Sequence, residues 1–145
     1  MSYERLIAEH ALIDAALVRL QGLVAEATPD LPAVTIALAD LSTELSQHLA
    51  HEDSFLYPGL IRSQHPRARG VARRFAQDFA ALRSDWNLYL REWIADCIAA
   101  DWDAFRVETA AMIARLDQRV KAENALLYTE ALRTGAILLR DRRAA

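Results

Sequence analysis

The chain has 145 residues, a length typical of one domain with a single hydrophobic core. Hydrophobic residues make up 53% of it and charged residues 26%, while glycine and proline are scarce at four each, a balance that favours helices over a sheet-rich fold. The formal net charge of -3 excludes a strong electrostatic attraction to nucleic acid or to an anionic membrane surface.

The first predicted helix covers residues 2–27. Its apolar residues recur at spacings of three and four, the period of one face of an α-helix, and His10 is the one ionisable residue in this stripe. The N-terminus carries both signs of charge and has no long apolar run, so it does not resemble a signal peptide. No uncharged apolar stretch is long enough to span a bilayer. We therefore expect a cytoplasmic protein.

The second predicted helix covers residues 33–62 and lies between two proline-containing breaks. Its inward stripe is Val34, Leu38, Leu41, Leu45, His48, Glu52 and Phe55. His48 and Glu52 are one turn apart, so they share a face of the helix. Ionisable groups in a core stripe need a metal, an opposite charge or a full set of hydrogen bonds.

The third and fourth predicted helices cover residues 68–99 and 102–133. Asp78 lies beside the apolar stripe of the third helix, and Glu123 lies within the stripe of the fourth, one turn after Arg119. Neither these helices nor the first two show an internal sequence repeat.

Four amphipathic helices with mostly short connections predict an all-α fold, an antiparallel up-down four-helix bundle forming a single domain over residues 1–145. Because neighbouring helices alternate in direction, an early residue of one helix faces a late residue of the next. The ionisable residues of the four helices would then meet in the bundle interior, as in the metal sites of other bundles. These candidate metal ligands are His10, His48, Glu52, Asp78 and Glu123. Two imidazoles and three carboxylates suit iron or manganese.

Three segments, at residues 9–14, 48–58 and 119–128, resemble the motifs of the hemerythrin-like (HHE cation-binding) domain family. The resemblance implies a four-helix bundle that typically holds a di-iron site. It also implies that His10 and His48 are ligands, that Glu52 is a bridging carboxylate, and that the fourth-helix motif supplies a further carboxylate.

Two positions depart from the family pattern. Arg119 stands where the fourth-helix motif has a histidine, and Gln77-Asp78 stands where the third helix usually offers Glu-His. A guanidinium cannot lose its proton and cannot ligate a metal. Near the buried carboxylates, Arg119 would instead replace the charge of a metal with its own.

Two functions therefore stay open. The first is a non-haem iron-binding protein with a mono- or dinuclear site, acting in oxygen or redox sensing or in iron handling. The second is a metal-free bundle whose arginine–carboxylate network supports protein interaction or signalling. A protein partner or a homodimer fits either function.

Other chemistries find little support in the sequence. It has no nucleophile motif, no glycine-rich phosphate loop and no Ser/Cys–His arrangement, so we do not expect an enzyme. The single cysteine, Cys97, excludes an internal disulfide and a cysteine-rich zinc site.

Overall fold

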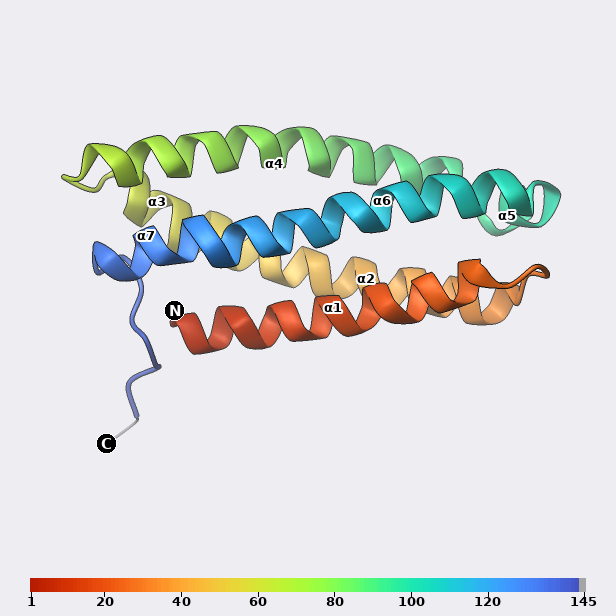
Figure 1. Cartoon of the computed structure of the whole chain (residues 1–145), viewed down its shortest axis with the longest axis horizontal. Coiled ribbons are helices and arrows are strands. Elements are labelled where there is room, and N and C mark those ends of the chain that lie inside the picture. The colour runs from red at the N-terminus through yellow and green to blue at the C-terminus, as the bar shows by residue number, and fades with distance from the viewer. Residues whose placement is uncertain (144–145) are drawn as a thin grey trace.

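The computed structural model describes residues 1–143, and most of them are helical. Four long helical stretches lie side by side and alternate in direction along the chain (Figure 1). They are α1 (Tyr3–Ala25), α2 (Leu31–His51) continued by η1 (Glu52–Leu56) and α3 (Tyr57–Ile61), α4 (Pro66–Glu92), and α6 (Trp102–Ala122) continued by η2 (Glu123–Leu127) and α7 (Tyr128–Arg133). A short helix, α5 (Ala95–Ala100), joins α4 to α6. The predicted all-helical class is confirmed.

Capping residues explain where the long helices begin. The side chains of Ser2, Asp30 and Asp101 each accept a hydrogen bond from the backbone N–H three residues on, at the starts of α1, α2 and α6. Helix α4 begins at Pro66, where the missing N–H costs no helical hydrogen bond. N-capping side chains and a proline thus define the residue at which each of the four stretches begins.

The third predicted helix ends earlier than expected, at Glu92 rather than residue 99. At this point the indole N–H of Trp93 donates to a Glu108 carboxylate oxygen on α6 at 2.6 Å. The chain then turns and forms α5, which buries Ile98 in the hydrophobic core. The break thus lets α5 close this end of the molecule.

Two π-helical turns, η1 and η2, interrupt the second and fourth stretches. The N–H of Tyr57 donates to the carbonyl of Glu52, and that of Tyr128 to the carbonyl of Glu123, each five residues back rather than four. The extra residue rotates the helix that follows. As a result Leu56 is fully buried, while Phe55 is 57% exposed, which corrects its predicted place in the inward stripe.

The buried apolar residues form two clusters. The larger one lies toward α5 and includes Ile13, Leu45 and Val120; the smaller one lies toward the chain ends and includes Leu6 and Leu127. Between these levels of the bundle lies a group of buried polar side chains. Within residues 1–143, no helix is both long enough and apolar enough to cross a membrane.

Candidate metal centre

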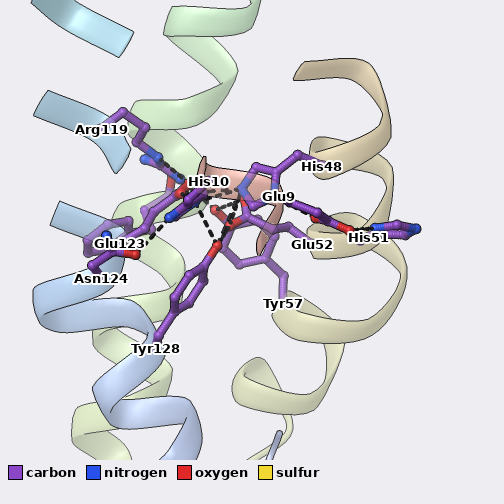
Figure 2. A network of polar contacts seen from close by, with 11 residues as sticks. Glu9, His10, His48, His51, Glu52, Tyr57, Arg119, Glu123, Asn124 and Tyr128 are labelled. Carbon is purple, nitrogen blue, oxygen red and sulfur yellow. Dashed lines mark hydrogen bonds and ion pairs between the residues drawn. The ribbon is translucent and has the colours of Figure 1, made fainter. Parts of the chain in front are cut away.

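Four of the five predicted ligands converge in the polar layer between the two clusters (Figure 2). They come from three of the long stretches and are at most 2% exposed. One ligand atom from each lies within 4.8 Å of all the others. The four residues are His10, His48, Glu52 and Glu123.

The facing atoms are the Nε2 atoms of the histidines and one oxygen of each carboxylate. His10 Nε2 lies 3.0 Å from His48 Nε2 and 3.1 Å from Glu123 Oε2. His48 Nε2 lies 3.3 Å from Glu52 Oε1 and 3.5 Å from Glu123 Oε2. Ligands held about 2.1 Å from a tetrahedral ion are about 3.4 Å apart. The spacing therefore suits four ligands around one ion.

The other ring nitrogen of each histidine is held from outside the group. His10 Nδ1 lies 2.7 Å from Asn124 Oδ1, and His48 Nδ1 lies 2.8 Å from a Glu9 carboxylate oxygen. Glu9 also contacts His51 Nδ1 through its other oxygen. Because amide and carboxylate oxygens only accept, each Nδ1 carries a hydrogen, and each Nε2 is aimed at the centre of the group.

Asp78, the fifth predicted ligand, is not part of this group. Helix α4 turns Phe75, Phe79 and Leu82 inward, and Asp78 points away from this stripe and is exposed. The sequence placed Asp78 beside the stripe, and one residue on a helix rotates a side chain by about 100°. The structure therefore corrects the expectation that Asp78 faces the other candidates.

Arg119 lies against the opposite side of the two carboxylates. Its Nε donates to Glu123 Oε1 at 3.0 Å, and its Nη2 donates to Tyr57 Oη at 2.6 Å. The Tyr57 hydroxyl is in turn 3.5 Å from Glu52 Oε2. The guanidinium thus neutralises one carboxylate and reaches the other through a tyrosine.

Tyr128 is the closest further side chain to the facing ligand atoms. Its hydroxyl donates to Glu52 Oε1 at 3.1 Å and lies 2.9 Å from His10 Nε2 and 3.3 Å from His48 Nε2. The spacing of apolar residues in the sequence did not indicate that four further residues belong to the site, namely Glu9, Tyr57, Asn124 and Tyr128.

Contrary to the expectation from the sequence, the helices do contain one short repeat of residue spacing, and it includes both tyrosines. Two triplets have the same spacing of four and then five residues: His48, Glu52 and Tyr57, and Arg119, Glu123 and Tyr128. In each triplet the glutamate begins a π-helical turn and the tyrosine follows it.

The electrostatics of the group centre on His48. Burial alone would lower the pKa of His48, but its contacts with Glu123, Glu52 and Glu9 outweigh burial and raise that pKa to about 11. Burial likewise favours the neutral form of Glu123, yet His10, His48 and Arg119 hold the pKa of its carboxyl well below the usual range. Burial, together with the charge of Glu123, raises the pKa of Glu52. Without a metal, then, a proton on His48 supplies positive charge to this group.

A small cavity adjoins the group. Its volume is about 30 Å³. His48, Arg83, Arg119 and Glu123 contribute to its lining, and the other lining residues are apolar, Trp86 among them. A single water needs roughly 10–15 Å³ measured in this way. The cavity therefore has room for a molecule of two or three atoms beside the ligand group.

The donor set fits one transition-metal ion. Two imidazole nitrogens and two carboxylate oxygens suit iron, manganese or zinc. The far oxygens of both carboxylates are engaged by Arg119 and Tyr57, so they are not free for a second ion.

Comparison with known protein families supports a cation-binding role for these residues. The family model of the hemerythrin HHE cation binding domain matches residues 1–131. The matched range includes all four converging side chains. No curated protein and no solved structure matches the chain.

Proposed function

The chain belongs to the hemerythrin HHE cation-binding family, and we propose that its buried group of two histidines and two glutamates binds non-haem iron. One observation carries the proposal: both histidine Nε2 atoms and one oxygen of each carboxylate face a common point. The two Nδ1 atoms are held by hydrogen bonds to Asn124 and Glu9. The antiparallel four-helix bundle that we assign to the chain brings these residues together.

An iron ion held here would supply one-electron redox chemistry. The residues around it would exclude bulk water, since all four are buried, and would admit only a very small molecule through the adjoining cavity. Oxygen or redox sensing, or iron handling, suits such a site better than catalysis on a larger substrate. We therefore propose a binding protein rather than an enzyme.

Iron loading under anaerobic conditions tests the proposal. After removal of unbound metal, we expect elemental analysis to find stoichiometric iron in the wild-type protein. His48→Gln should lower iron affinity at least tenfold, because it removes a ligand nitrogen. His65→Gln, at an exposed loop histidine, is the matched control and should retain iron. Wild-type protein without stoichiometric iron would overturn the proposal.

A metal-free structural bundle is the second candidate. It is favoured by the 3.0 Å ion pair between Arg119 and Glu123 and, among the described residues, by the absence of any buried side-chain polar atom without a partner. In this case the wild-type protein would hold no metal. Arg119→Met would then lower the free energy of unfolding by about 3–5 kcal/mol, the cost of leaving a buried charge unpaired. An unchanged free energy of unfolding would contradict the second candidate.

A further inference from the structure

We propose that Arg119, held by Tyr57, fills the position of a second cation in this site and thereby limits the site to one metal ion. The inference rests on the proposed metal-binding function. It concerns how many ions the site accepts and which side chain sets that number.

The internal repeat first indicates a second cation position. Each triplet places a basic residue one turn before a glutamate that begins a π-helical turn, and a tyrosine directly after that turn. The triplets are His48, Glu52 and Tyr57, and Arg119, Glu123 and Tyr128. The repeat therefore puts Arg119 where His48 stands in the other triplet, so the two halves of the site differ at the residue that decides whether an ion can be ligated.

The carboxylates themselves have two sides. Glu123 Oε2 faces the two histidine Nε2 atoms, while Glu123 Oε1 accepts from Arg119 Nε at 3.0 Å. Glu52 Oε1 faces His48 Nε2 and Oε2 faces the hydroxyl of Tyr57. Two carboxylates that each present one oxygen to each of two places can bridge a pair of cations, as in the di-iron carboxylate bundles. Here the second place holds a guanidinium and a phenol.

Several contacts keep Arg119 in this position. Its Nη1 donates to the carbonyl of Phe75 at 2.9 Å, and its guanidinium carbon lies 4.7 Å from the centre of the Phe75 ring and 5.3 Å from that of Phe79. The side chain is only 12% exposed. A guanidinium remains charged at all ordinary pH values, so it repels a metal ion at the same place.

Charge balance supports the same conclusion. The buried carboxylates of Glu52 and Glu123, together with that of Glu9 behind His48, contribute three negative charges. With neutral histidines, Arg119 and one divalent ion balance them. A second divalent ion would leave two uncompensated positive charges in a region that is almost inaccessible to water, which is strongly unfavourable.

Counting bound ions tests the inference. The metal-free full chain would be titrated anaerobically with Fe(II), and the bound iron would be counted after removal of the excess. We expect one ion in the wild-type protein.

Arg119→His makes the repeat complete and should raise the number to two. Arg119→Gln, which removes the charge and offers an amide oxygen, should also exceed one. Arg115→His, an exposed position one turn earlier on α6, is the matched control and should stay at one.

Electron paramagnetic resonance after oxidation gives an independent readout. An isolated high-spin Fe(III) ion has a strong signal, whereas two coupled Fe(III) ions lose it. We expect the strong signal in the wild type and its loss in Arg119→His. Two ions in the wild type, or one ion in both folded Arg119 variants, would overturn the inference and leave the proposed iron binding intact. A wild type with no ion would overturn the proposed function itself.

Discussion

His48 is buried in a stripe of apolar residues, yet both of its ring nitrogens have partners. Nε2 faces the common point of the ligand group, and Nδ1 lies 2.8 Å from the carboxylate of Glu9. Burial raises the free energy of the charged imidazole, but three carboxylates around it outweigh this effect and raise its pKa to about 11. Glu9 therefore both orients the ring and increases the basicity of Nε2, although it does not face the centre itself.

Replacing Glu9 tests this indirect role. Glu9→Ala removes the acceptor for His48 Nδ1, so the ring is free to rotate and Nε2 becomes a weaker ligand. We expect metal affinity to fall about 10- to 100-fold with one ion still bound, which is the usual cost of losing such a partner. Titration against a competing chelator measures the change. Glu4→Ala, at an exposed position on the same helix, is the control, and equal affinities in the two variants would contradict the role of Glu9.

At the scale of single elements, the two π-helical turns position the carboxylates. Glu52 and Glu123 each begin such a turn, and the following tyrosine donates its N–H five residues back. The wider turn adds one residue without reversing the inward face of the helix beyond it, since Leu60 and Ala131 are still buried. Turns of this kind cost helical hydrogen-bond geometry and are frequent at functional sites. We therefore infer that they serve the site rather than the packing.

Deletion of Ser54, an exposed residue of η1, separates these two roles. The deletion leaves Tyr57 four residues after Glu52, so a regular α-helix can keep both on one face. We expect a folded protein with an unchanged or higher melting temperature. Its metal affinity should be at least tenfold lower, because the Glu52 carboxylate no longer points at the other ligands. Circular dichroism and a chelator titration measure the two effects. The deletion of Gln64, in the connection before α4, is the control; loss of fold in the Ser54 deletion alone would show that the turn serves packing.

The same turns mark the limit of what the sequence alone predicts. Hydrophobic spacing places all four helical stretches, because each buries a continuous apolar face, and four of the five candidate ligands converge. The prediction from hydrophobic spacing is wrong for Phe55, which is exposed, since a period of 3.6 residues does not hold through a π-helical turn. It also fails at Asp78, where one position around the helix decides between core and solvent. The pattern also gives no sign of the roles of Tyr57 and Tyr128, because their hydroxyl groups contact residues on other helices.

At the scale of the whole molecule, the polar group divides the hydrophobic core into two clusters. Its ligands come from α1, from the junction of α2 with η1, and from the start of η2, so one ion would connect three of the four long stretches. Arg119 connects the fourth, because it donates to the carbonyl of Phe75 on α4. Metal binding should therefore stabilise the folded chain as a unit rather than one helix of it.

Metal-dependent stability tests this connection. A ligand that binds only the folded state at 100 times its dissociation constant adds about 2.7 kcal/mol. For a chain of this size, that corresponds to a rise of about 5–10 °C in melting temperature. We expect such a rise when Fe(II) is added anaerobically to the metal-free protein, and its reversal by a chelator. His48→Gln should show about half of this rise or less, because a tenfold loss of affinity leaves about 1.4 kcal/mol of the stabilisation. An equal rise in the wild type and in this variant would mean that iron stabilises the protein by binding elsewhere.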